Sequence, residues 1–202
     1  MYTFIVNPNA KTSLGYQVWS SLEAILKEKN VNYQVFFTKY QKHATRLAQK
    51  LTQESGAKTL IVLGGDGTIN EVINGIEDLD GTVLGYIPIG SSNDFARGMG
   101  LSTDPVQALK HILSPEHFTY INIGTAMYAG KTRRFAVSSG LGFDAGVCHQ
   151  VYVSKLKKLL NKLHLGKLSY AAVALQQILT MTPLKMTLTL DDNTPIELYK
   201  TY

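Results

Sequence analysis

Cysteine is nearly absent from this chain of 202 residues, which contains only Cys148. One thiol excludes an internal disulfide framework and indicates a reducing compartment. Free cysteine usually packs as a small apolar side chain, so we expect Cys148 to be a core residue. The fold must then rest on an apolar core, which a hydrophobic fraction of 45% can supply.

Long apolar runs are also missing. The longest candidate, 170–179, contains Gln176 and Gln177 and is far shorter than the roughly 20 residues that cross a bilayer. The start, MYTFIVNPNA, lacks the basic segment of a signal peptide, and its apolar run ends at Asn7-Pro8. We therefore expect a cytoplasmic protein that does not span a membrane.

Acidic residues are missing from residues 145–190, although the chain as a whole carries 15 Asp and Glu. The same segment contains Lys155, Lys157, Lys158, Lys162, Lys167 and Lys185. A basic segment of this kind can face nucleic acid or an anionic membrane surface, or it can be a solvated lysine face. Composition alone leaves these three alternatives open.

What the chain does contain is a regular alternation of strand and helix patterns up to about residue 113. The expected strands are 2–6, 31–38, 59–63 and 83–89, and the expected helices are 14–29, 44–51, 69–76 and 105–113. Asp104 and Pro105 begin the last helix as N-cap and first residue. Such alternation predicts an α/β fold with a parallel sheet, whose ligands bind at the carboxyl ends of the strands.

The pattern changes after residue 117. Strands are expected at 117–123, 134–139, 184–190 and 196–202, with a turn at Ala129-Gly130-Lys131 and helices at 144–163 and 168–181. The last strand has no following partner, as in an unfinished sheet. We therefore expect two domains: an α/β domain over residues 1–122, and an incomplete β-rich domain over 123–202.

The end of the third expected strand, LIVLGGDGTINEVINGI at residues 60–76, is unusually rich in glycine. Glycine accepts φ > 0, so this loop is expected to turn sharply, and its exposed backbone N–H groups can bind an anion. A helix beginning near Ile69 would add the positive end of its dipole. Asp66 then needs a reason to lie near an anion, which a divalent cation or a proton to accept would supply.

Two familiar phosphate motifs do not fit this loop. A P-loop needs a Lys after its last glycine, and the dinucleotide motif needs glycine where Asn70 stands. A tight turn without a ligand remains the simpler alternative, but it would not need three glycines together with Asp, Thr, Asn and Glu.

Two further polar loops follow strands. PIGSSNDFARG, residues 88–98, supplies small donors, Asp94 as a candidate helix cap, and Arg97 as a partner for a carboxylate or a phosphate. The third loop contains Asn7, Asn9, Lys11 and Ser13. Three such loops at one sheet edge favour a nucleoside triphosphate as the ligand.

These loops resemble the diacylglycerol kinase catalytic-domain family, which includes bacterial lipid kinases and the sphingosine and ceramide kinases. The matching stretches are Gly64 to Val72, Gly90 to Ala96, GLGFDAGV at 140–147 and LGKLSYAAVAL at 165–175. They span nearly the whole chain. The first alone would not be specific, because NAD kinases and phosphofructokinases carry similar loops.

The resemblance implies a nucleotide-binding domain like that of NAD kinase and phosphofructokinase, followed by part of a β-sandwich domain. It implies transfer of the γ-phosphate of ATP, with Mg²⁺, to a lipid hydroxyl, most simply diacylglycerol to give phosphatidic acid. The residues that would contact the nucleotide are Asn7, Pro8, Asn9, Ala10, Lys11, Thr38, Gly64, Gly65, Asp66, Gly67, Thr68, Ile69, Asn70 and Ser91.

Other roles also follow from the resemblance. Asp66 would lie beside the phosphates as a metal-linked acid or a base. Glu71, Gly90, Asn93 and Asp94 would support the loops, and Asp144 would approach the lipid head group. The basic segment would then rest on an anionic membrane surface, with the protein cytoplasmic and peripherally attached. No nucleic-acid partner is expected, and the last strand allows a homodimer.

Two departures from the family pattern stand out. Ser91 replaces the usual Thr and keeps the hydroxyl. Family members are about half as long again, and the part after Tyr202 would complete the sandwich and supply metal ligands and the main catalytic base. A kinase of another substrate such as NAD, and a nucleotide-binding protein without catalysis, therefore remain alternatives.

Overall fold

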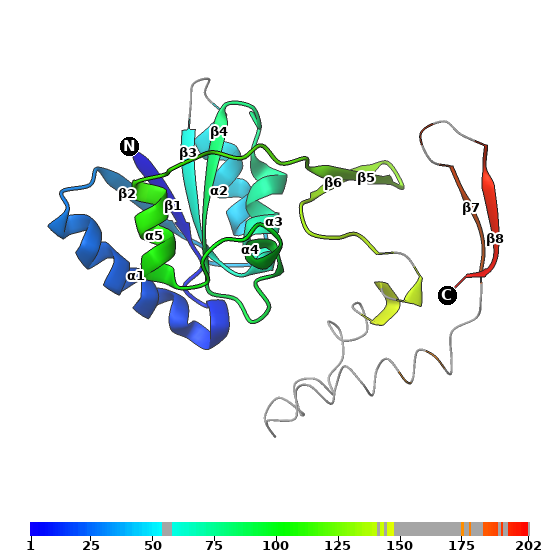
Figure 1. Cartoon of the computed structure of the whole chain (residues 1–202), viewed down its shortest axis with the longest axis horizontal. Helices are drawn as coiled ribbons and strands as arrows, with labels where there is room; N and C mark the ends of the chain where they lie inside the picture. The colour runs from blue at the N-terminus through cyan, green and yellow to red at the C-terminus, as the bar shows by residue number, and fades with distance from the viewer. Residues whose placement is uncertain are drawn as a thin grey trace. The chain divides into compact units, whose positions relative to one another are not determined.

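The computed structural model describes residues 1–53, 58–140, 142–143, 145–147, 175, 178, 184–189, 191 and 194–201. The chain divides into two compact units, Met1–Ser138 and Ser139–Tyr202. The functional boundary expected between residues 122 and 123 remains a prediction. Each unit is described by itself (Figure 1).

The first unit follows the predicted alternation. Its elements are β1 (Tyr2–Val6), α1 (Ala10–Glu28), β2 (Tyr33–Phe37), α2 (His43–Thr52), β3 (Lys58–Gly64), α3 (Asp66–Gly75), β4 (Thr82–Pro88), α4 (Asp94–Gly98), α5 (Pro105–Leu113), β5 (Gly124–Tyr128) and β6 (Lys131–Phe135). The Asp104 side chain accepts a bond of 2.8 Å from the Gln107 N–H, so the predicted cap of α5 is confirmed. Pro105 opens that helix, as expected.

The four strands β1 to β4 form one parallel sheet in the order β2-β1-β3-β4. Val6 lies beside Phe37 and Leu63, and Gly64 lies beside Pro88, so the strands end together. The predicted α/β fold with a parallel sheet is confirmed. The loops that follow these ends therefore share one edge of the sheet.

Both faces of the sheet are buried, which explains the continuous apolar strands. Phe4 and Leu63 pack on one face with Trp19 and Leu22 of α1 and with α5. Ile5 and Val62 point to the opposite face and pack with α2 and α3. Figure 1 shows these two helix layers on opposite sides of the sheet.

The strand expected at 117–123 is wrong. These residues belong to no strand, and the hairpin is formed by β5 and β6 around a turn at Ala129-Gly130. Ile121 and Ile123 are partly buried against the core that α2 and α3 cover. Their alternation reflects packing of an extended connection, because alternate residues of any extended chain face the same side.

Arg134 of β6 attaches this hairpin to the end of α3. Its backbone N–H donates to Asn74 Oδ1 at 2.9 Å, and Asn74 Nδ2 donates to the Arg134 carbonyl at 2.8 Å. The guanidinium donates to the carbonyls of Ile73 and Ile76 at 3.2 and 2.6 Å. A cation at a helix C-terminus satisfies carbonyls that have no partner within the helix and complements the dipole.

The second unit contains an antiparallel pair, β7 (Leu184–Leu188) and β8 (Ile196–Thr201). Both strands and the turn between them were expected. The helices expected at 144–163 and 168–181 lie mostly outside the described residues, as do Cys148 and Asp144. Within the described part of the chain, no helix is both long and apolar enough to cross a membrane.

The α2–α3 crossing depends on Gly75. A Cβ built there would collide with the Thr45 carbonyl, which is backbone and cannot rotate away. We expect Gly75→Ala to lower the free energy of unfolding by about 1–3 kcal/mol, as overpacking does. Gly98→Ala is the matched control, since a Cβ there meets nothing within 4 Å. Urea unfolding of both variants checks this; equal stabilities would contradict the close crossing.

Candidate functional site

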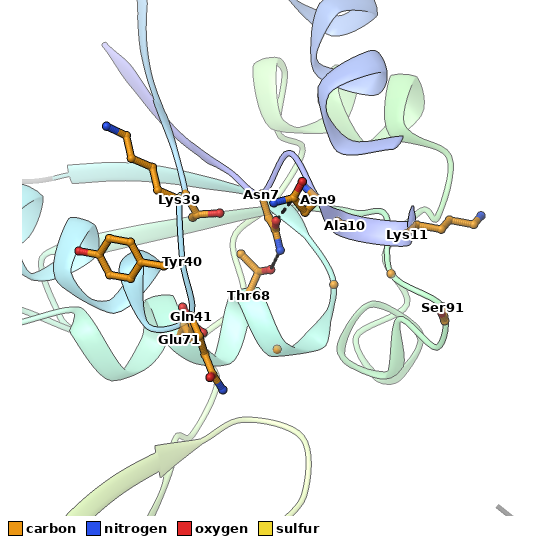
Figure 2. A pocket seen from close by; sticks show the side chains of 14 residues that line it. Asn7, Asn9, Ala10, Lys11, Lys39, Tyr40, Gln41, Thr68, Glu71 and Ser91 are labelled. Carbon is orange, nitrogen blue, oxygen red and sulfur yellow. Dashed lines mark hydrogen bonds between the residues drawn. The ribbon is translucent and has the colours of Figure 1, made fainter. Parts of the chain in front are cut away.

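The loops at the carboxyl edge of the sheet enclose a pocket of about 500 Å³ (Figure 2). Three chain segments that were predicted to bind a ligand meet there, together with the end of β2. The lining residues are Asn7, Asn9, Ala10, Lys11, Thr38, Lys39, Tyr40, Gln41, Gly65, Gly67, Thr68, Glu71, Gly90 and Ser91. The volume falls in the range of small-molecule sites.

Asn7 joins the first loop to the glycine loop. Its Nδ2 donates to Thr68 Oγ1 at 3.1 Å, and its Oδ1 accepts from the Asn9 N–H at 3.0 Å. The chain then enters α1 with Lys11 and Ser13 in the left-handed region, at φ 46° and 73°. Helix α1 begins at Ala10, four residues before the expected start at residue 14, and these two φ values make its first turn irregular.

The glycine loop does not turn by positive φ, which corrects the expectation from sequence. Gly64, Gly65 and Gly67 are all outside the left-handed region, and α3 begins directly at Asp66. Glycine is required by close approach instead. A Cβ at Gly64 would lie 2.6 Å from the Thr68 side chain, and one at Gly65 would lie 3.1 Å from the Gly90 Cα.

Gly67 serves a different purpose. A Cβ built there meets nothing within 4 Å, and the residue lines the pocket. The N-cap residue of α3, Gly65, has no side chain to cap the helix. The N–H groups of Thr68 and Ile69 donate to the Gly65 carbonyl, so the start of α3 offers the pocket its dipole and the N–H groups of Asp66 and Gly67, an arrangement that suits phosphate.

Asp66 makes a contact that the sequence did not predict. Its Oδ1 accepts from the Phe95 N–H at 3.0 Å, so the glycine loop caps α4 of the neighbouring loop. Asp94, the expected cap, instead pairs with Arg97 at 3.0 Å on the surface. Asn93, at φ 54°, precedes α4, and its Oδ1 accepts from the Gly90 N–H at 2.7 Å. The last two loops thus form one connected unit.

Several predicted residues are not among those that line the pocket. They are Pro8, Gly64, Asp66, Ile69, Asn70, Asn93 and Asp94, whereas the other predicted residues that the structure describes line it. Ile69 is a core residue with 1% exposure. Asn70 faces β6. When its amide is oriented to suit both neighbours, its nitrogen donates to the Arg134 carbonyl and its oxygen accepts from the Arg133 guanidinium.

Lys39, Tyr40 and Gln41 line the pocket but were not predicted. The rule that ligands bind after parallel strands applies equally to the end of β2, and extending it beyond Thr38 would have found them. Glu71 of α3 holds this segment, because its Oε1 accepts from the Lys42 N–H at 2.9 Å.

Tyr86 supports the end of β3 from below the loop. Its hydroxyl donates to the Gly64 carbonyl at 3.2 Å. Burial raises the pKa of this phenol, and the charge of Asp66 raises it further. The native state therefore favours the neutral phenol.

Comparison with known proteins places this geometry in a family. The model of the diacylglycerol kinase catalytic domain matches residues 1–126. The chain belongs to this family.

Individual relatives agree with the family match. The chain is 34% identical to "Putative lipid kinase YtlR" of Bacillus subtilis strain 168, over 95% of the chain and 63% of that protein. It is 30% identical to a protein of Staphylococcus epidermidis named "Diacylglycerol kinase", over 94% of the chain and 56% of that protein.

A solved structure is also similar. A crystal structure titled as that of a putative diacylglycerol kinase from Bacillus anthracis superposes with a TM-score of 0.69 at 25% identity, covering 98% of the chain and 61% of that protein. The chain thus spans about three fifths of the length of these relatives.

The capping role of Asp66 is testable by stability. We expect Asp66→Ala to lower the free energy of unfolding by about 0.5–2 kcal/mol, because α4 loses the acceptor of its Phe95 N–H. Asp66→Asn keeps an acceptor oxygen and should lose less. Urea unfolding measures both, with Asp94→Ala as the control for a surface carboxylate. If Asp94→Ala proves as costly as Asp66→Ala, the assignment of the cap is wrong.

The raised pKa of Tyr86 predicts a stability change in alkali. A raised native pKa stabilises the fold fully below the ordinary tyrosine pKa of about 10, and this contribution is lost as pH rises above it. Tyr86→Phe should be about 1 kcal/mol less stable at pH 8, since it lacks the bond to Gly64. Between pH 10 and 11 the difference should shrink. Parallel unfolding curves over pH 8–11 would contradict this.

Proposed function

We propose that this chain is the nucleotide-binding part, with a portion of the lipid-binding part, of an ATP-dependent lipid kinase. The observation that supports this most directly is the pocket at the start of α3, where Gly67 leaves open space and no side chain caps the helix. Lys11 adds a positive charge at the same pocket. Together these groups suit the triphosphate of ATP.

The proposed reaction moves one phosphoryl group. A lipid hydroxyl oxygen forms a bond to the γ-phosphorus while the bond from that phosphorus to the bridging oxygen of ADP breaks. The hydroxyl proton passes to a base, which we assign to the region of the longer relatives that this chain does not match. Diacylglycerol is the proposed acceptor, which gives phosphatidic acid, in keeping with the printed names of the relatives.

Mg²⁺ is the cation that we propose to accompany ATP. It is usually held by one or two carboxylates together with phosphate and water oxygens, so a cluster of several acidic side chains is not needed. Asp66 is the carboxylate that we propose for it, because it directly precedes the pocket-lining Gly67 in the first turn of α3. When bound, the ion would neutralise charge on the phosphates.

Membrane contact through the basic segment is part of the same proposal. Lys185, the member of that segment that the structure describes, lies 3.0 Å from Glu197 in an ion pair. It therefore contributes less than a free lysine to attraction by anionic lipid, for which about 1 kcal/mol per basic residue is usual. The proposal rests on the other lysines of residues 145–190.

The nucleotide site is tested by binding before turnover. We expect the chain to bind Mg-ATP, and Gly67→Val to weaken binding at least tenfold, because the new side chain fills space that the phosphates would occupy. Gly98→Val is the matched control, since Gly98 has equal free space away from the pocket. Calorimetric titration measures both. Failure of the unaltered chain to bind Mg-ATP would refute the site.

Turnover is then measured as transfer of labelled γ-phosphate. Diacylglycerol, monoacylglycerol and sphingosine are offered in anionic micelles, with NAD as the non-lipid acceptor, to this chain and to the chain extended to the length of its relatives. Label in a lipid supports the proposal. Label in NAD alone would replace the lipid kinase with a kinase of another substrate.

A further inference from the structure

The pocket has two chemically different ends. Figure 2 shows Lys11 and Ser91 on one side of Asn7 and Thr68, and Lys39 and Tyr40 on the other. The first end has a lysine and the start of α3, which suit phosphate. The second also has a lysine, Lys39, but it adds the aromatic ring of Tyr40, which can contact a planar group and has no counterpart at the first end.

The segment that carries Tyr40 is fixed at three points. The Thr38 N–H donates to the Val6 carbonyl at 2.8 Å, which ties its start to β1. The Lys39 N–H donates to His43 Nδ1 at 3.0 Å. The backbone N–H of Lys42, a residue at φ 68°, donates to Glu71 Oε1 at 2.9 Å. Backbone held in this way presents its side chains without paying an ordering cost when a ligand binds.

The Tyr40 ring is also held in place. It stacks on His43 with ring centroids 4.6 Å apart and planes 22° from parallel. Arg46 Nη1 donates to the Tyr40 hydroxyl at 3.1 Å, with the guanidinium carbon 5.6 Å from the ring centroid. Despite these contacts the residue is 52% exposed. The ring is therefore fixed but not part of the core, and Tyr40 is one of the residues that line the pocket.

We propose that Tyr40 contacts the base of the bound nucleotide, with His43 and Arg46 as positioning residues for its ring. The inference rests on the proposed use of ATP and adds which end of the pocket takes which end of the ligand. Aromatic side chains bind nucleobases by stacking, which tolerates different bases because every base has a π-face. Phosphates at the start of α3 then leave the base to extend toward Tyr40.

The experiment separates base from phosphate. Binding of Mg-ATP and of inorganic tripolyphosphate with Mg²⁺ is measured by calorimetric titration for the unaltered chain, Tyr40→Ala and Tyr40→Phe. We expect Tyr40→Ala to weaken Mg-ATP binding by about 5- to 100-fold, as loss of one stacking contact does, and to leave tripolyphosphate binding unchanged. Tyr40→Phe keeps the ring and should bind Mg-ATP within about threefold of the unaltered chain.

Tyr120→Ala is the matched control, because Tyr120 is 97% exposed and is not among the residues that line the pocket. A positioning role for Arg46 predicts that Arg46→Ala weakens Mg-ATP binding and adds nothing further in the Tyr40→Ala background. Circular dichroism confirms that each variant is folded.

Each outcome distinguishes the two proposals. If Tyr40→Ala binds Mg-ATP as the unaltered chain does, Tyr40 is a surface residue and the inference is wrong. Equal losses for Mg-ATP and tripolyphosphate would also overturn it, because Tyr40 would then act through the loop. If the unaltered chain binds neither ligand, the nucleotide site itself fails and the proposed function with it.

Discussion

The close approach of Gly65 to Gly90 is the constraint on which the site depends. β3 and β4 stay paired to Gly64 and Pro88, and the Ile89 N–H still donates to the Gly64 carbonyl at 2.9 Å beyond the last ladder pair. A Cβ at Gly90 would lie only 2.8 Å from the Gly65 Cα, and one at Gly65 would be tight at 3.1 Å from the Gly90 Cα. At this close approach Asp66 reaches the Phe95 N–H at 3.0 Å and links α3 to α4.

This contact explains why Asp66 and the glycines occur together. In the structure the carboxylate is a cap that links two loops, and it balances part of the positive end of both short helices. A negative charge there also opposes ionisation of Tyr86, whose hydroxyl supports the same strand end. The charge of Asp66 therefore interacts with the start of α4 and with the Tyr86 hydroxyl at the strand end. A cation bound to Asp66 would change both interactions.

The sequence predicted the sheet well because β1 and β3 are buried on both faces, and only apolar runs satisfy that environment. The sequence also located most of the pocket, because ligands of parallel sheets bind where the strands end and the loops that line the pocket follow such ends. The sequence prediction failed where contacts between distant residues determine the structure. Ile121 and Ile123 alternate without forming a strand, because they pack against the core. Gly64 is needed because a side chain there would collide with Thr68, and not because its φ is positive. Tyr40 was missed because its partners, His43 and Arg46, follow it in an ordinary helix.

Helix α3 has a distinct function at each end. Its first turn lines the pocket at Gly67 and Thr68, and its last turn receives Arg134 and, through Asn74, the backbone of β6. Between them Ile69, Val72 and Ile73 are fully packed in the core, so the helix cannot shift at one end alone. The position of the hairpin and the shape of the pocket at Gly67 and Thr68 are consequently set by one rigid element. A ligand that moved the start of α3 would therefore have to move the β5–β6 hairpin with it.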